Sequence, residues 1–337
     1  MQVTIVGAGS WGTAVSTIIG NSTDVRLWAR RDELADAIES TRRNDEYLPG
    51  FDLPPRVHAT ASLEEALAAA DVVVMAVPSH GFRAVMTETR DLVDASTPII
   101  SLTKGIEQET LMRMTEVIAD VAPDHDAARI GVLTGPNLAK EVAAGQPAAA
   151  VIAMADSDAA ANLQHLFMRP TFRVYTNTDV VGCESAGALK NVMAIAAGMA
   201  HGLGFGDNTK AMLITRAIAE ITRLGVVLGG NPMTFAGLAG MGDLIATCMS
   251  DKSRNHRVGF GLGQGRSLDE IIGEMNMVAE GVKSTRGVLA LAEQNGVEMP
   301  IAVQVGKVLY EGVSPAAAVA DLMGREAKPE MQRYEPE

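Results

Sequence analysis

Short runs of valine and isoleucine alternate with longer amphipathic stretches through the first half of the chain. Several of these runs are apolar at every position, which is typical of strands buried on both faces of a parallel sheet. The pattern predicts strands at 3–6, 25–28, 71–77, 98–102, 130–133 and 148–154. Because strands that alternate with helices form βαβ units, we expect an α/β domain with a mostly parallel sheet.

The pattern changes near Asp179. Alanine, leucine and methionine then recur at helical spacing, as in 188–195, and no convincing strand follows. We therefore expect two domains, an α/β domain over 1–178 and an all-α domain over 179–324. The polar segment 176–179 joins them and can also cap the next helix. The polar stretch 325–337 is predicted to be a disordered tail.

Length and charge narrow the range of functions. The 337 residues suit two domains of ordinary size, and a hydrophobic fraction of 47% can bury substantial cores. The 28 lysines and arginines stand against 41 acidic residues, a net charge of -13, so the overall field repels nucleic acid and acidic membranes. An anionic small ligand must therefore be held by a local group of cations or backbone amides.

The cysteine count and the apolar runs bear on the cellular compartment. Cys183 and Cys248 are too few for the disulfide framework of a secreted module. The chain opens without the features of an export signal, and apolar runs such as 71–77 and 151–154 are too short to cross a bilayer. We therefore expect a cytoplasmic protein with no membrane insertion.

A glycine-rich segment follows the first predicted strand. Gly7, Gly9 and Gly12 fit the pattern G-x-G-x-x-G at the start of an apolar helical stretch, with Ser10 and Trp11 before the last glycine. In a dinucleotide-binding turn, such glycines allow the tight turn, the approach of a pyrophosphate and close helix–strand packing. A purely structural glycine turn is the alternative, and the strand–turn–helix context favours a Rossmann-like domain that binds a dinucleotide.

Arg30 and Arg31 follow the second predicted strand, where an acidic residue would accept hydrogen bonds from a free ribose 2′-hydroxyl. Asp32 and Glu33 come too late for that role, whereas two guanidinium groups suit a 2′-phosphate. We therefore predict NADP as the preferred cofactor, ahead of NAD. The alternative is that both arginines are the solvated start of a helix.

Three candidate substrate residues follow later strands, at the edge where ligands of open α/β sheets bind. Lys104 suits an anionic or hydroxyl-bearing substrate, Gly135 permits close backbone approach, and Asn137 offers a short polar side chain at a helix start. An ordinary surface lysine and a helix cap would explain them equally well.

Lys190 lies among small apolar residues of a helical stretch. Burial disfavours the ammonium form, so the pKa of this lysine would fall and the amine could act as a general base. A snorkelling lysine at a helix edge is the alternative. Asp243, after a glycine-rich turn, is either an N-cap or a carboxylate that orients Lys190.

Ser253, Arg254 and Asn255 supply a hydroxyl, a forked cation and an amide in succession. This set of donors suits a phosphate group. A basic loop is the alternative, because lysine, histidine and arginine flank the three residues.

Together these segments resemble the bacterial-type NAD(P)-dependent sn-glycerol-3-phosphate dehydrogenases. The match covers nearly the whole chain in order, and the segments 188–191, 206–210 and 253–255 are more specific than the glycine pattern. The resemblance implies reversible hydride transfer between NAD(P)H and dihydroxyacetone phosphate, giving sn-glycerol 3-phosphate for phospholipid synthesis. It also implies an all-α C-terminal domain of the 6-phosphogluconate dehydrogenase type, while the oligomeric state stays open, with a homodimer as one expectation.

The resemblance further implies a role for each matching residue, and it implies no metal site. Lys190 is the catalytic proton acceptor in the oxidation direction, and Lys104 lies between cofactor and substrate. The substrate site is lined by Lys104, Gly135, Asn137, Lys190, Asp243, Ser253, Arg254 and Asn255. The cofactor positions are Gly7, Gly9, Ser10, Trp11, Gly12, Arg30, Arg31, Tyr47, Lys104, Ala139, Arg254, Val278 and Glu280.

Two positions depart from the family pattern. Asn137 stands where a small hydroxyl residue is more usual, and Lys252 stands where an apolar residue is frequent. Two other functions stay open: a β-hydroxyacid-type dehydrogenase that acts on a carboxylate, and a non-catalytic NADPH sensor. The phosphate-suited segment 253–255 argues against the first, and the second would need Arg30 and Arg31 but not Lys190.

Overall fold

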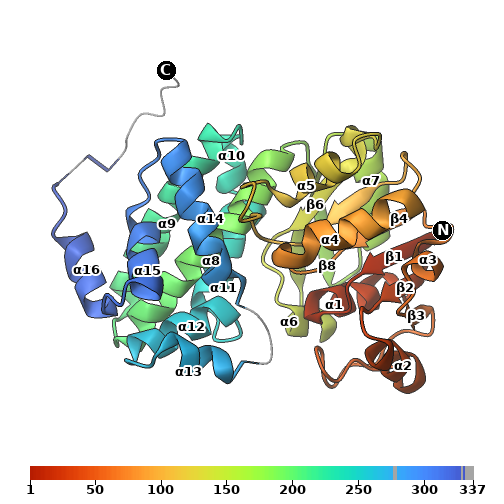
Figure 1. The fold of residues 1–337 in the computed structure, drawn as a ribbon, viewed down its shortest axis with the longest axis horizontal. Coiled ribbons are helices and arrows are strands. Elements are labelled where there is room, and N and C mark those ends of the chain that lie inside the picture. The colour runs from red at the N-terminus through yellow and green to blue at the C-terminus, as the bar shows by residue number, and fades with distance from the viewer. Residues whose placement is uncertain (276–278, 328, 331–337) are drawn as a thin grey trace.

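The computed structural model describes residues 1–275, 279–327 and 329–330. A sheet flanked by helices lies on one side of the molecule, and a group of helices lies on the other (Figure 1). Val278 and most of the predicted tail, 325–337, lie outside the described residues.

The sheet has eight strands in the order β3-β2-β1-β4-β5-β6-β7-β8. Strands β1 to β6 are parallel, β7 runs antiparallel to β6, and β8 runs parallel to β7. The prediction of an α/β domain with a mostly parallel sheet is confirmed. The strands are β1 (Gln2–Val6), β2 (Asp24–Trp28), β3 (Val57–Thr60), β4 (Val72–Met75), β5 (Ile99–Ser101), β6 (Ile130–Thr134), β7 (Ala148–Met154) and β8 (Phe172–Asn177).

The sequence patterns missed the two edge strands, β3 and β8. Both lie at an end of the sheet, and β8 alternates buried and exposed positions over its first four residues. A search for fully apolar runs finds interior strands and overlooks edge strands of this kind. The strand predicted at 71–77 is also shorter than expected, because the chain leaves the sheet after Met75 and Pro78 caps the next helix.

Helices cover both faces of the sheet. One face packs against α1, α2, α6 and α7, and the other packs against α3, α4 and α5. These helices are α1 (Ser10–Ile19), α2 (Asp32–Thr41), α3 (Leu63–Leu67), α4 (Ser79–Thr89), α5 (Met114–Val121), α6 (Ala139–Ala143) and α7 (Ser157–Phe167), with short 3₁₀ turns at Arg90–Leu92 and Ala127–Arg129.

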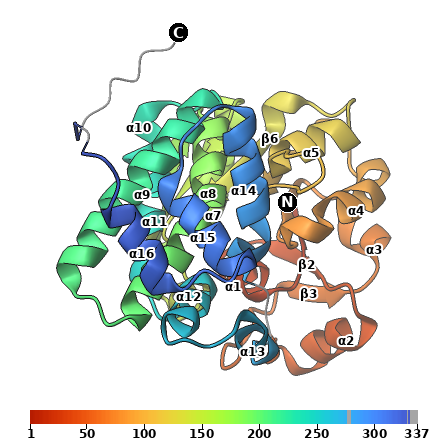
Figure 2. The same ribbon diagram turned by 60° about the vertical axis from the view of Figure 1, so that its left-hand side comes forward.

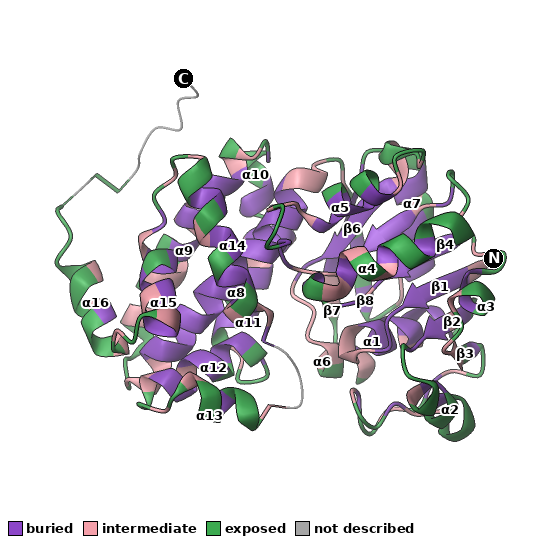
Figure 3. Cartoon of the chain, viewed as in Figure 1, coloured by how far each residue is buried: buried purple, intermediate pink, exposed green. Residues whose placement is uncertain are grey.

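The described residues of the second half form helices joined by loops, with no strand among them, as predicted. Its centre is α8 (Val180–Gly202), which is buried along most of its length and contacts α9, α11, α12, α14 and α15 (Figures 2 and 3). Asp179 caps α8 by accepting a hydrogen bond from the Gly182 amide. The other helices are α9 (Asp207–Val227), α10 (Pro232–Phe235), the π-helical turn η3 (Leu238–Gly242), α11 (Asp243–Met249), α12 (Arg254–Gly263), α13 (Leu268–Gly273), α14 (Glu280–Gln294), α15 (Pro300–Tyr310) and α16 (Pro315–Met323).

Helix α8 corrects the expectation that every apolar segment is too short to cross a bilayer. Its 23 residues pass a length and composition test for a membrane span, and the bent stretch of Pro232–Met249 with Arg254–Gly263 passes as a broken span. However, 89% of the apolar window of α8 is buried inside the protein. That degree of burial is what the central helix of a packed domain requires.

A buried ionic contact fixes α8 against the sheet domain. The Glu184 carboxylate, on the first turns of α8, accepts hydrogen bonds from the Thr115 amide at 2.9 Å and from the Arg113 guanidinium at 2.9 Å. Because Glu184 is only 4% exposed, this contact is well shielded from water. It sets the position of the helix that carries Lys190.

Candidate active site

The three glycines of the turn after β1 differ in why a side chain would or would not fit. Gly7 has a φ of +124°, and a Cβ there would lie 2.7 Å from the Ala76 carbonyl oxygen. A Cβ on Gly12 would lie 2.0 Å from the Gly7 carbonyl oxygen, so this position must stay small for α1 to pack. A Cβ on Gly9 would meet nothing within 4 Å. The protein itself does not need a glycine there, and the open space beside the first amides of α1 suits a pyrophosphate.

The loop after α2 is fastened to this turn. The Asn44 amide donates to the Ala8 carbonyl oxygen and to the Thr13 hydroxyl, both at 2.8 Å, and the Ser10 hydroxyl donates to the Tyr47 carbonyl oxygen at 2.6 Å. These bonds place Tyr47 next to the start of α1. Trp11 lies half-buried against Phe172, and Ala139 begins α6, which packs on α1.

Arg30 and Arg31 lie exposed just beyond the end of β2. The Gly7 amide donates to the Trp28 carbonyl oxygen at 3.1 Å, so the two arginines are close to the glycine turn. Arg31 is the N-cap residue of α2, and its guanidinium donates to Glu46 at 2.5 Å. Both features that the sequence left as alternatives, a cation pair near the glycine turn and a solvated helix start, are therefore present.

One carboxylate holds both candidate lysines. Asp243 Oδ1 lies 2.8 Å from Lys190 Nζ, and Asp243 Oδ2 lies 2.5 Å from Lys104 Nζ. Lys104 also donates to the Gly135 carbonyl oxygen at 3.2 Å. Because Lys104 and Gly135 follow β5 and β6, while Lys190 and Asp243 lie on α8 and α11, the cluster joins the two halves of the chain at the carboxyl edge of the sheet.

The surroundings of Lys190 lower its affinity for a proton. Its side chain is 7% exposed, and burial lowers the pKa of Lys190 to about 8, with a smaller contribution from the charge of Lys104 and an opposing one from Asp243. The interpretation as a snorkelling lysine is therefore wrong. Burial raises the pKa of the neighbouring Cys248 thiol to about 12, so that thiol stays protonated near neutral pH.

Asp243 is not a helix cap. The N-cap residue of α11 is Gly242, and Asp243 lies in the first helical turn with 2% of its surface exposed. The Asp243 carboxylate instead forms ion pairs with Lys104 and Lys190. The sequence alternative in which it orients Lys190 matches this geometry.

The segment 253–255 is built into the fold rather than forming a solvated basic loop. Ser253 caps α12 by accepting from the His256 amide at 3.3 Å, and Asn255 Oδ1 accepts from the Gly281 amide at 2.9 Å. Both side chains are buried. Arg254 interacts electrostatically with the negative charge of Glu280, so these two predicted cofactor residues lie near each other. The flanking Lys252 instead forms an ion pair with Glu141, with 2.7 Å between Nζ and Oε1.

Asn137 does not cap a helix, because α6 begins at Ala139 and its N-cap residue is Leu138. The Asn137 amide nitrogen instead donates to the Ala149 carbonyl oxygen at 2.9 Å. Its Oδ1 is buried and has no hydrogen-bond partner, and the same is true of Thr134 Oγ1. Buried polar atoms without partners near Lys104 and Gly135 suit a ligand that supplies hydrogen bonds.

Three residues that sequence reasoning missed support the predicted ones. Thr247 Oγ1 accepts from Lys190 Nζ at 2.5 Å, the Asn191 amide donates to the Lys104 carbonyl oxygen at 3.4 Å, and the Ser79 hydroxyl donates to Glu280 at 2.6 Å. Thr247 carries a usable signal, because it follows Asp243 by four positions and therefore shares its helix face. Nothing near Ser79 in the sequence indicates its contact with α14.

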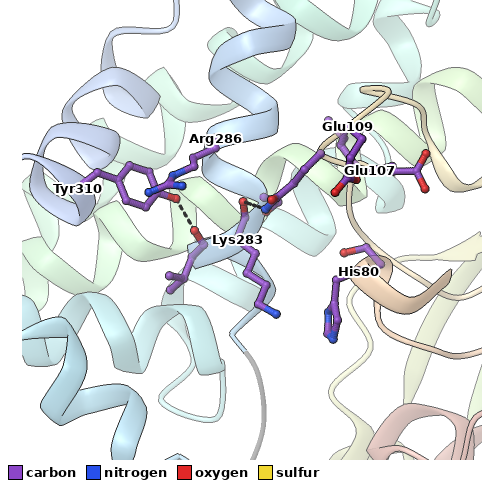
Figure 4. Close-up of a pocket in the computed structure, with 11 residues that line it drawn as sticks. His80, Glu107, Glu109, Lys283, Arg286 and Tyr310 are labelled. Atoms are coloured by element: carbon purple, nitrogen blue, oxygen red, sulfur yellow. Dashed lines mark hydrogen bonds between the residues drawn. The ribbon is translucent and has the colours of Figure 1, made fainter. Parts of the chain in front are cut away.

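A cavity of about 340 Å³ lies beside this site, between the loop after β5 and helix α14 (Figure 4). Its lining mixes acidic and basic side chains, among them Glu107, Glu109, Lys283 and Arg286. None of its lining residues is a predicted cofactor or substrate residue. The cavity therefore lies outside the lysine cluster, and Ser79, which donates to Glu280, is one of its lining residues.

The fold and the site define a class of protein. A glycine turn at the start of a parallel sheet and a buried lysine on the central helix of a second, helical half are the parts of a two-domain NAD(P)-dependent dehydrogenase. Models of the N-terminal and C-terminal parts of NAD-dependent glycerol-3-phosphate dehydrogenase match residues 2–160 and 179–320. The chain belongs to this family and is an oxidoreductase of the glycerol-3-phosphate dehydrogenase type.

Individual relatives agree with the family models. The chain is 56% identical over 305 residues to glycerol-3-phosphate dehydrogenase (NAD(P)+) 2 of Sphingopyxis alaskensis, covering 90% of this chain and 91% of that protein. It is 52% identical over 331 residues to glycerol-3-phosphate dehydrogenase (NAD(P)+) of Streptomyces avermitilis, covering 98% of each. The crystal structure of glycerol-3-phosphate dehydrogenase from Coxiella burnetii has a TM-score of 0.92 and 37% identity, over 96% of this chain and 99% of that chain.

Proposed function

We propose that the chain reversibly reduces dihydroxyacetone phosphate to sn-glycerol 3-phosphate with NAD(P)H, and that Lys190 handles the proton. The observation that carries this proposal is the buried Lys190 amine, held by Asp243 at 2.8 Å and by Thr247 at 2.5 Å. Since a pKa of about 8 leaves both protonation states accessible near neutral pH, one group can serve both directions of the reaction.

In oxidation, neutral Lys190 accepts the proton of the substrate C2 hydroxyl at Nζ. In reduction, the Lys190 ammonium returns a proton to the C2 oxygen. The bound nicotinamide cofactor supplies the hydride acceptor in the first direction and the hydride donor in the second. Asp243 and Thr247 hold Nζ in place, so the lysine spends little conformational freedom on reaching the substrate.

The substrate phosphate requires cations against a net charge of -13. We assign Lys104, Arg254 and the donors of Ser253 and Asn255 to the glycerol phosphate, because together they supply cations and hydrogen-bond donors from both halves of the chain. Gly135 and Asn137 lie beside Lys104, where the partnerless Asn137 Oδ1 suits a substrate hydroxyl. Glu280, held by Ser79, belongs to the cofactor side.

For the cofactor, we assign the pyrophosphate to the turn containing Gly7, Gly9 and Gly12 and the adenosine end to Arg30, Arg31 and Tyr47. The open space at Gly9 and the exposed arginines nearby support this assignment. Two guanidinium groups at the end of β2 favour a 2′-phosphate, so NADPH is the preferred cofactor.

The test is a substrate comparison at fixed NADPH. We expect NADPH oxidation with dihydroxyacetone phosphate and little with unphosphorylated dihydroxyacetone or with 3-oxo acids. A chain that turned over a 3-oxo acid and left dihydroxyacetone phosphate unchanged would be a β-hydroxyacid-type dehydrogenase instead, and the proposal would fail.

We also propose the domain division 1–178 and 179–324, a cytoplasmic location and a homodimer. The gap between the end of β8 at Asn177 and the start of α8 at Val180 supports the division. Cys183 and Cys248 are buried free thiols, as suits a reducing compartment.

Between 205 and 233, the apolar side chains of Phe205, Met212, Val227 and Met233 are exposed, which supports a subunit contact. A monomeric mass in light scattering would contradict the homodimer.

A further inference from the structure

Three side chains with metal-ligating atoms meet away from the lysine cluster. They are His201 in the last turn of α8, His256 in α12, and Asp251 in the loop before α12. His201 Nδ1 lies 3.4 Å from His256 Nε2, and Asp251 Oδ1 lies 4.0 Å from His201 Nδ1 and 3.8 Å from His256 Nδ1.

The two histidines are held by a close contact between α8 and α12. A Cβ on Gly198 of α8 would lie 2.1 Å from the His256 carbonyl oxygen, and a Cβ on Gly259 of α12 would lie 2.0 Å from the Ile195 carbonyl oxygen. The glycines thus let the two backbones touch, which brings the imidazole centroids to 5.3 Å. Ligands on packed helices of this kind keep their geometry before an ion arrives.

The spacing fits a first-row transition metal. One ligand atom from each residue can be chosen so that all lie within 4.8 Å of one another. In a tetrahedral zinc site with bonds of about 2.0–2.1 Å, ligand atoms lie roughly 3.4 Å apart, so small side-chain rotations suffice. Two imidazoles and a carboxylate are a common donor set for zinc, with the fourth position left to water.

A hydrogen bond between the two imidazoles would explain their short distance, but it leaves part of the cluster unexplained. His256 is 3% exposed, and its Nδ1 is buried with no hydrogen-bond partner. Asp251 faces that atom at 3.8 Å, which is too long for a hydrogen bond and suits two ligands of one ion. A buried polar atom of this kind calls for a ligand or ordered water.

We propose that His201, Asp251 and His256 form a binding site for a divalent transition metal ion of the zinc class. The positive charge of Lys210 also acts on His256 and weakens the site, although Lys210 Nζ lies 3.7 Å from Asp207. The site therefore binds reversibly and is not a structural zinc centre. A net charge of -13 favours cations near the surface in general.

Metal binding has a consequence for the loop before α12. Asp251 precedes Ser253 by two positions, so an ion that fixes Asp251 restrains the loop that leads into 253–255. The KM for glycerol 3-phosphate should then change with zinc concentration. This consequence rests on the proposed role of Ser253, whereas metal binding itself does not.

The experiment titrates the chelator-treated full chain with ZnCl₂ by calorimetry and with Co²⁺ by visible absorption. We expect one ion per chain, and His201→Gln and Asp251→Asn should each weaken binding by at least about tenfold. Both residues reach the surface, so these variants should fold, which circular dichroism checks. The matched control is His58→Gln, a histidine bonded to Glu39 on the sheet domain, which should bind as the wild type does.

Two results would overturn the proposal. One is the absence of Zn²⁺ and Co²⁺ binding by the wild type, and the other is unchanged affinity in both His201→Gln and Asp251→Asn. Since the titration needs no substrate or cofactor, a failure of the proposed dehydrogenase activity would leave its outcome unaffected.

Discussion

Two ion pairs lie at opposite ends of the proposed site, and they differ in their exposure to water. Arg31 and Glu46, at the cofactor end, are 49% and 48% exposed and lie 2.5 Å apart. Lys190 and Asp243, at the substrate end, are 7% and 3% exposed and lie 2.8 Å apart. The N–O distances of the two pairs are similar, so the pairs differ in their exposure to solvent and not in their geometry.

Exposure decides what each pair can do. Water screens Arg31 and Glu46, so their pairing contributes little and Arg31 can turn to a phosphate at small cost. Lys190 and Asp243 are shielded from water, so burial brings the pKa of Lys190 to about 8 even though the charge of Asp243 opposes that shift. The comparison teaches that the exposed pair suits reversible binding of a cofactor and the buried pair suits proton transfer.

The largest effect is expected from Lys190→Ala. Loss of the proton acceptor should lower kcat by about 10²–10⁴-fold, while the dissociation constant of NADPH stays nearly constant. Steady-state kinetics and fluorescence titration measure the two quantities. Lys307→Ala, on α15, is the matched control and should keep its activity. Turnover of Lys190→Ala at the wild-type rate would remove Lys190 from the mechanism.

A smaller and selective effect is expected from Arg31→Ala. A charge-assisted hydrogen bond to the 2′-phosphate would be lost, so the KM for NADPH should rise about tenfold. The KM for NADH, which lacks that phosphate, serves as the internal control and should change little. An equal rise for both cofactors would show that Arg31 supports the fold of the loop rather than reading the phosphate.

The smallest effect is expected from Glu46→Gln. Glu46 competes with the cofactor phosphate for Arg31, and an exposed pair of this kind is worth under about 1 kcal/mol. The KM for NADPH should therefore fall by about twofold, and the fall should shrink as salt is added. If the KM rose instead, Glu46 would be positioning Arg31 rather than competing for it.

Features encoded by neighbouring residues could be predicted from the sequence. The interior strands, the glycine turn and the long helix α8 follow from apolar runs, from backbone conformations that glycine tolerates, and from helical periodicity. The sequence also favoured burial of Lys190, because its neighbours on the helix are small and apolar. The resemblance to the dehydrogenase family rested on segments of the same local kind.

Features that depend on distant pairing could not be predicted. Lys104 and Asp243 are 139 positions apart, and nothing local distinguishes a carboxylate shared by two lysines from a helix cap. The partner of Arg31 lies on a loop whose path is set by the bonds of Asn44. The edge strands β3 and β8 were missed because each lacks a second neighbour in the sheet, so the fully apolar pattern is not required of them.

The central claim is that the buried Lys190–Asp243 pair sets the proton chemistry. It is tested by the pH dependence of kcat/KM for oxidation of glycerol 3-phosphate. Oxidation needs neutral Lys190, so kcat/KM should rise with pH and level off above about 8, clear of the substrate phosphate, which titrates near pH 6.

Asp243→Asn removes the carboxylate that raises the pKa of Lys190, so in this variant the break should move to lower pH and the plateau should fall. Circular dichroism of the variant checks that it is folded. A break at the same pH in wild type and Asp243→Asn, or a wild-type break near the ordinary lysine value of 10.5, would contradict the account.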